Sequence, residues 1–238
     1  MAKLDLALAL RQIGEVAVRD STPILAQGAV LLTLPALAQR LVAPGHSLGT
    51  VLAVVAGLAA ALFIVLVSYG TLARLAGRPL ALPDYFRRAV VASPPGYNVA
   101  LLLGAAGVGV AIVPLGLRLA GVASPGVVVF GLAAAVIAGV IVVLPAVPLA
   151  LAERRPPLVA LARAAALTRG NRGRITALLL VAGLAIGPVA LAIDRLGGDA
   201  GATLASGQLW ALLLFDLLAA SLLATIPAVV YTQLARPS

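Results

Sequence analysis

The sequence predicts an all-α fold, a polytopic integral membrane helical bundle of about six transmembrane helices with short amphipathic helices on its inner face. Composition is the first observation: 62% of the 238 residues are hydrophobic and 11% are charged, whereas soluble domains have roughly 45–50% apolar and 25% charged residues. The second is the length of the apolar runs at 51–67 and 126–152, because about 20 apolar residues cross the hydrocarbon core as a helix. Abundant Ala, Leu and Gly favour packed helices over a membrane barrel, whose strands would alternate polar and apolar residues.

Six apolar segments are long enough to cross a membrane, and we expect them to form a single transmembrane domain over residues 1–238. Their expected bounds are 20–40, 48–73, 97–117, 126–152, 175–193 and 208–234. Pro35 lies near the end of the first span and should kink it, because proline removes a backbone donor and clashes with the preceding turn. A Pro-Gly turn that contains His46 joins the first two spans.

Three shorter segments are expected to form amphipathic helices beside the spans. On a helix over residues 2–19, four apolar side chains share one face: Leu6, Leu10, Ile13 and Ala17. This pattern is typical of a helix that lies among the lipid headgroups, and a solvated or frayed helix is the alternative. The other two segments are 85–92 and 158–168.

The positions of the basic residues predict the orientation of the chain. With the N-terminus inside, 14 of the 17 Lys and Arg residues lie on the inner side, and the outer side has Arg40, Arg118 and Arg195. Short loops rich in Lys and Arg remain cytoplasmic. We therefore expect both the N-terminus and the C-terminus in the cytoplasm.

The stretch at 148–174 has the clearest local signals. Pro156 and Pro157 suit the start of a short helix, where a missing N–H costs little. Gly170 suits the left-handed residue that ends that helix. Asn171 is then a natural N-cap for the fifth span. These signals predict a short helix between two tight turns, in a stretch rich in arginine.

The same stretch resembles the membrane domain attached to bacterial glycerophosphodiester phosphodiesterases, a domain also found alone as a small membrane protein. That family shows a Pro and an acid at the inner end of a span, then a helix with an Arg, and then a turn of the form Leu-Thr-x-Gly-x-Arg. The matching residues here are Pro148, Glu153, Arg163, Leu167, Thr168, Gly170, Arg172 and Arg174. The resemblance implies a stand-alone membrane-domain protein that lacks the hydrolase domain and lies, as a multi-pass protein, in the bacterial inner (plasma) membrane.

The net charge of +9 would raise nucleic acid as a partner of a soluble protein. Here the charges lie in short loops beside apolar spans, so anionic lipid headgroups are the expected partners and nucleic acid is not expected. The residues expected to contact headgroups are Arg154, Arg155, Arg163, Arg169, Arg172, Arg174, Arg87 and Arg88.

No residue pattern in the chain points to catalysis. There is no Cys, and the single His, His46, lies in an expected outer turn. Nucleophilic catalysis needs a nucleophile, a base and an orienting group within reach of one another, and no cluster has the spacing of metal ligands. We therefore expect no enzyme activity, no catalytic residue, no metal and no cofactor.

Asp216 is the acidic residue that falls well inside an expected span. An ionisable side chain there costs on the order of 2.5–3.5 kcal/mol, so we expect the carboxyl to face the bundle and find a partner. One interpretation is structural, a neutral or paired carboxyl that fixes a helix contact. The other is functional, a proton or solute pathway.

Two functions remain open from the sequence. The first is a non-enzymatic, lipid-contacting scaffold or accessory module of the cell envelope, and the alternative is a small proton- or solute-coupled transporter centred on Asp216. The sequence is compatible with a homo-oligomer and identifies no protein partner. Similar stretches also raise an internal duplication of helical hairpins, roughly 49–117 and 124–193, for which chance similarity between Ala- and Leu-rich helices is the alternative.

Overall fold

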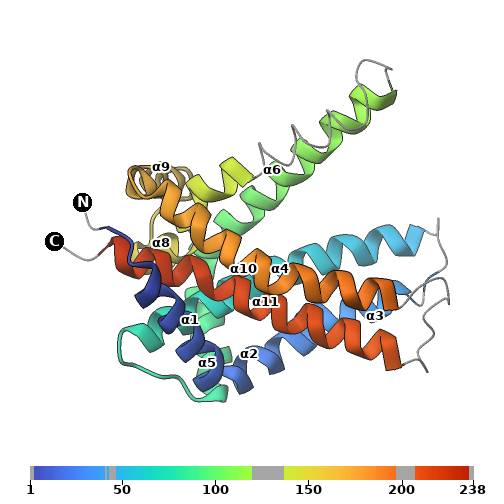
Figure 1. Ribbon diagram of the computed structural model, residues 1–238, viewed down its shortest axis with the longest axis horizontal. Coiled ribbons are helices and arrows are strands. Elements are labelled where there is room, and N and C mark those ends of the chain that lie inside the picture. The colour runs from blue at the N-terminus through green and yellow to red at the C-terminus, as the bar shows by residue number, and fades with distance from the viewer. Residues whose placement is uncertain (1–2, 41, 43–46, 120–136, 197–206, 236–238) are drawn as a thin grey trace.

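A computed structural model describes residues 3–40, 42, 47–119, 137–196 and 207–235. Every regular element in these ranges is a helix. The long helices Ser47–Leu75 and Arg172–Leu196 lie alongside Gly207–Leu234, whereas Pro94–Leu119 projects away from them at an angle (Figure 1). The expected all-α class is therefore confirmed. The turn at His46 and the tips of two other expected loops lie outside the described residues.

Four described helices are long and apolar enough to cross a membrane, and their bounds are Ser21–Arg40, Ser47–Leu75, Arg172–Val189 and Leu209–Leu234. A fifth crossing is formed if the bent pair Pro83–Ala92 and Pro94–Ala106, which meet at 71°, is one broken span. The chain thus fits a multi-pass helical membrane bundle. Six spans are not confirmed.

The expected fourth span, 126–152, is the span for which the structure differs most from the prediction. Residues 120–136 lie outside the described part, as does that portion of the second hairpin of the duplication. The described portion, Ile137–Glu153, is a shorter apolar helix. It is interrupted by a turn at Leu144 and Pro145, after which α8 runs over Ala146–Glu153. Proline explains the interruption, because it cannot donate the hydrogen bond that would continue a helix.

The first span is one helical rod with an altered turn in its middle. It comprises α2 (Ser21–Gly28), the π-type turn η1 (Ala29–Thr33) and α3 (Leu34–Arg40). The Leu34 N–H bonds to the Ala29 carbonyl, five residues back. A wider turn directly before Pro35 accommodates the proline ring, which would otherwise clash with a carbonyl of the preceding turn.

The centre of the bundle is the contact between α4 (Ser47–Leu75) and α11 (Gly207–Leu234), the most extensive helix pair in the described structure. The other face of α4 packs against α6 (Pro94–Leu119) and α8. α10 (Arg172–Leu196) lies alongside α11 (Figure 1). These helices bury several apolar clusters, one with Val65 and Leu149 and another with Val229.

The N-terminal helix α1 (Leu6–Arg19) is present as expected, but its buried face differs from the expected one. Ala9, Ile13 and Val16 are buried, whereas Leu10 is 43% exposed. The reason is a neighbour that sequence periodicity does not reveal, since α1 packs across α11 as well as touching α10. The helix is thus part of the protein core on one side, with Asp5 as its N-cap.

Polar contacts tie the start of the chain to the ends of two distant helices. The Leu4 N–H donates to Asn171 Oδ1 at 2.9 Å, and Arg174 donates to the Leu4 carbonyl at 2.7 Å. The Asp5 N–H donates to Gln233 Oε1 at 3.0 Å. Because these residues lie at the start of α10 and the end of α11, the N-terminus is held at the same end of the bundle as the C-terminal end of α11 (Figure 1).

Candidate functional site

The short helices gather at one end of the bundle, together with the ends of α1 and α11 (Figure 1). We call it the basic end; it is formed by α1, α5 (Leu82–Ala92), α8, α9 (Pro157–Thr168) and the last turn of α11. Both α5 and α9 match short helices expected from the sequence, and each has a proline in its first turn. Gly170 follows α9 with φ +88°, which confirms the expected left-handed turn.

An inserted aromatic ring fixes α5 to the bundle. Tyr85 is 2% exposed, and its ring lies directly on Gly70 of α4, where any Cβ would overlap it. Glycine is required at this close approach for that reason. Asp84, Arg87 and Arg88 lie on the same short helix outside this contact, and Arg88 pairs with Asp84 at 3.8 Å. The insertion of Tyr85 therefore decides where these charges lie.

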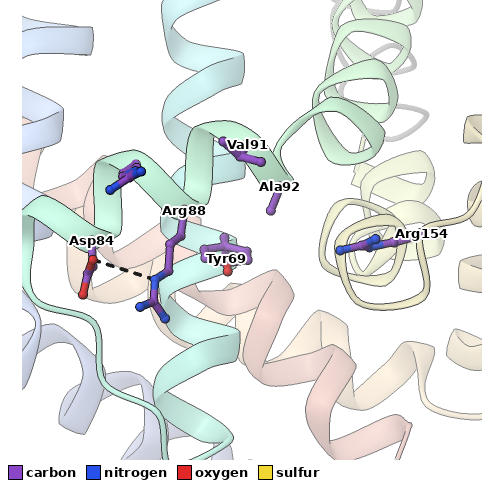
Figure 2. Close-up of a pocket in the computed structure, with 7 residues that line it drawn as sticks. Tyr69, Asp84, Arg88, Val91, Ala92 and Arg154 are labelled. Atoms are coloured by element: carbon purple, nitrogen blue, oxygen red, sulfur yellow. Dashed lines mark ion pairs between the residues drawn. The ribbon is translucent and has the colours of Figure 1, made fainter.

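Arg154 approaches the same region from another part of the chain. It ends α8 in the left-handed conformation, with φ 50° and ψ 42°. This conformation is uncommon for a residue with a side chain, and Arg154 is the one described non-glycine residue with positive φ. Its guanidinium points toward the side on which Tyr69 and Arg88 lie (Figure 2).

These residues line an open cleft of about 450 Å³, which we call the basic cleft. Its lining consists of Tyr69, Asp84, Arg87, Arg88, Val91, Ala92 and Arg154. The lining thus contains three guanidinium groups and one carboxylate. Within the described part of the chain, Arg87 and Arg154 have no carboxylate at ion-pair distance. The cleft therefore carries an excess of positive charge that is suited to an anion.

Arg155 and Arg163, two of the residues expected to contact headgroups, lie near the carboxylate of Glu153 instead. Glu153 lies 2.8 Å from Arg163 and 3.7 Å from Arg155. The pair with Arg163 closes the turn between α8 and α9, and so positions the neighbouring Arg154. The sequence did not predict this pairing, although both residues belong to the stretch that carries the family resemblance.

The remaining expected arginines lie at the basic end but outside the cleft. Arg174 bonds the Leu4 carbonyl, as described above. Arg169 and Arg172 are exposed beside Gly170. Of the expected headgroup contacts, the structure brings together Arg87, Arg88 and Arg154. It adds Tyr69, whose position at the end of a span was the available signal for such a role.

A buried ion pair that the sequence did not reveal supports this arrangement. Asp20, at the junction of α1 and α2, is 5% exposed. Arg74 near the end of α4 forms two contacts with its carboxylate, the first from Nε to Oδ2 at 2.9 Å and the second from the terminal nitrogen to Oδ1. The pair joins the first span to the second where the chain leaves α4 for α5.

Asp216 does not lie where it was expected. Its side chain is on the exposed surface of α11, and it forms no hydrogen bond or ion pair with the described residues. The expectation that this carboxyl faces the bundle and finds a partner is therefore wrong for the described structure. The buried side of α11 at this depth is formed by Leu213 and Leu217 instead.

Comparisons with known proteins add no relative to this description. No family model, no curated protein and no solved structure matches the chain. Among the described residues, no three His, Asp or Glu side chains are grouped closely enough to hold a metal ion.

Replacing Gly70 with Ala tests the anchoring of α5. The new methyl group would overlap the Tyr85 ring, so we expect the variant to lose roughly 1–3 kcal/mol of unfolding free energy, measured by thermal unfolding in detergent. Gly57→Ala is the matched control on the same helix, because a Cβ there meets nothing within 4 Å. Equal effects of the two substitutions would contradict the proposed role of Gly70.

Asp216→Leu tests the exposed position of that carboxyl. No described contact is lost, so we expect the unfolding free energy in detergent to change by about 0.5 kcal/mol or less. Asp20→Asn is the comparison, since it removes the charge partner of the part-buried Arg74 and should cost about 1–3 kcal/mol. A comparable loss in Asp216→Leu would show that Asp216 has a partner within the chain.

Proposed function

We propose that this chain is a non-enzymatic membrane module of the bacterial cell envelope that binds anionic lipid headgroups through the basic cleft. One observation carries the proposal: Arg87, Arg88 and Arg154 come from two separated segments and line one hollow. The left-handed conformation of Arg154 adds weight, because unusual backbone conformations cluster at functional sites.

The chemistry of the cleft favours phosphate as the bound group. Guanidinium is planar, remains charged at all physiological pH values, and can donate two parallel hydrogen bonds to phosphate oxygens. Tyr69 borders the same space, and its ring is of the type that sits at the level of lipid headgroups. Each basic side chain near an anionic membrane surface contributes about 1 kcal/mol.

The family resemblance gains support from the roles of the matching residues. Glu153 and Arg163 pair across the turn between α8 and α9. Thr168 is buried and donates to the Val142 carbonyl at 3.3 Å, and Gly170 has positive φ. These are structural roles of the kind a family pattern preserves. We accordingly propose that the chain is a relative of the glycerophosphodiester phosphodiesterase membrane domain.

The alternative, a transporter centred on Asp216, has less support. Transporter sites form near mid-membrane where several helices contribute polar groups. Asp216 lies on the exposed surface of α11 instead. The polar side-chain contacts described above gather at the basic end, which favours a function at the membrane surface.

The proposed orientation places the basic end in the cytoplasm. Because the chain has no native Cys, single cysteines report position without background. In intact cells we expect Ser47→Cys to react with a membrane-impermeant maleimide and Lys3→Cys to react only after permeabilisation. Both residues are exposed. Labelling of Lys3→Cys in intact cells, with Ser47→Cys protected, would place the cleft on the outer face.

Neutralising the cleft tests headgroup binding directly. In Arg87→Gln/Arg88→Gln/Arg154→Gln, three charges of about 1 kcal/mol each are lost, so the affinity for phosphatidylglycerol should fall about 100-fold, measured by native mass spectrometry at low salt. The matched control is Arg11→Gln/Arg169→Gln/Arg172→Gln, which removes equal charge from exposed positions of the basic end outside the cleft. An equal loss in the control would mean that charge acts diffusely and not through the cleft.

A further inference from the structure

A second hollow adjoins the basic cleft. It has a volume of about 690 Å³ and lies between the end of α4, the turn that follows it, α8 and the end of α11. Its apolar lining includes Leu72, Ala76, Leu80, Leu151, Ala152 and Tyr231. Tyr69 and Arg88 line both hollows, so the cationic space and the apolar space meet at these two side chains.

Small side chains and a backbone turn create this apolar space. Ala73, Ala76 and Ala152 occupy positions on its wall where larger side chains would fill it. Gly77 has φ +74° and turns the chain away from α4, after which Leu80 returns along the edge of the hollow. The volume lies within the range of about 300–1,000 Å³ that is usual for ligand sites.

The two hollows together fit a molecule with an anionic group and a hydrocarbon chain. A free phosphate ion would occupy the cleft and leave the apolar hollow exposed. A purely apolar molecule would fill the hollow and leave Arg87 and Arg154 without a counterion. Arg78 on the far wall of the hollow adds a second cationic edge. An amphiphile satisfies both parts, since its charged and apolar portions are joined at the position of Tyr69 and Arg88.

We propose that the chain binds one anionic glycerophospholipid as an individual ligand, with its phosphate among Arg87, Arg88 and Arg154 and one acyl chain in the hollow beside Leu72, Ala76 and Leu151. This inference rests on the proposed function and goes beyond it, because headgroup binding alone requires no place for the chain. The hollow distinguishes a lipid from a soluble phosphate compound, because only the lipid has a chain that can pack against Leu72 and Leu151.

The test fills the hollow without changing its charge. Ala76→Trp and Ala152→Trp place an indole in the space from two different elements, and Ala185→Trp is the matched control on the exposed surface of α10. Native mass spectrometry of the full chain in detergent, titrated with dioleoyl phosphatidylglycerol, should show one tightly held lipid per chain. We expect at least tenfold weaker binding in both hollow variants and unchanged binding in the control.

Two further ligands show whether the bound phosphate belongs to a lipid or to a soluble phosphate compound. Glycerol 3-phosphate should fail to compete with the lipid at equal concentration, and phosphatidylcholine should bind at least tenfold more weakly. If both hollow variants bind normally while Arg87→Gln/Arg88→Gln/Arg154→Gln does not, the acyl-chain site is overturned and headgroup binding stands. If the arginine variant also binds normally, both proposals fail. Equal binding of glycerol 3-phosphate overturns the acyl-chain site alone. Thermal unfolding of each variant confirms that it is folded.

Discussion

The ion pair between Asp20 and Arg74 is the contact on which the basic end depends. The Asp20 carboxylate is buried and the Arg74 side chain is part-buried, and removing one partner leaves the other charge without a counterion at a cost of about 1–3 kcal/mol. Asp20 connects α1 to the first span, and Arg74 lies one residue before the end of α4. The pair thus fixes the point from which the chain turns toward α5. The ring of Tyr85 on Gly70 then sets the position of that helix, and with it Arg87 and Arg88.

The arginines fall into two groups, those that form an ion pair with an Asp or Glu of the protein and those that do not. Arg74 is paired with Asp20 and Arg163 with Glu153, and both pairs join segments that are separate in the chain. Arg87 and Arg154 have no carboxylate at ion-pair distance among the described residues, yet both border the basic cleft. Because a cluster of like charges repels itself, a cleft of this kind is more stable when an anion occupies it. Arg74 and Arg163 thus connect parts of the fold, whereas Arg87 and Arg154, together with Arg88, are available to the proposed ligand.

Local signals in the sequence predicted local structure well. Proline in the first turn located α9, glycine located the turn at Gly170, and apolar length located the long helices. Features that depend on neighbouring helices were not predictable. The buried face of α1 is set by α11, and the exposed position of Asp216 is set by which side of α11 meets the bundle. The pair of Asp20 with Arg74 spans 54 positions, so spacing alone could not reveal it. Of the eight arginines expected to contact headgroups, the fold places Arg87, Arg88 and Arg154 around one cleft, and headgroup contact itself stays a prediction.

An experimental structure of the chain in nanodiscs rich in phosphatidylglycerol tests the central claim most directly. Cryo-electron microscopy with a rigid antibody fragment bound to the outer face would supply the needed particle size. The account predicts phosphate density between the guanidinium groups of Arg88 and Arg154, beside Tyr69, continuous with chain density toward Leu151. A basic cleft closed by direct packing of α5 against α8, with lipid phosphates ordered only elsewhere on the surface, would contradict it.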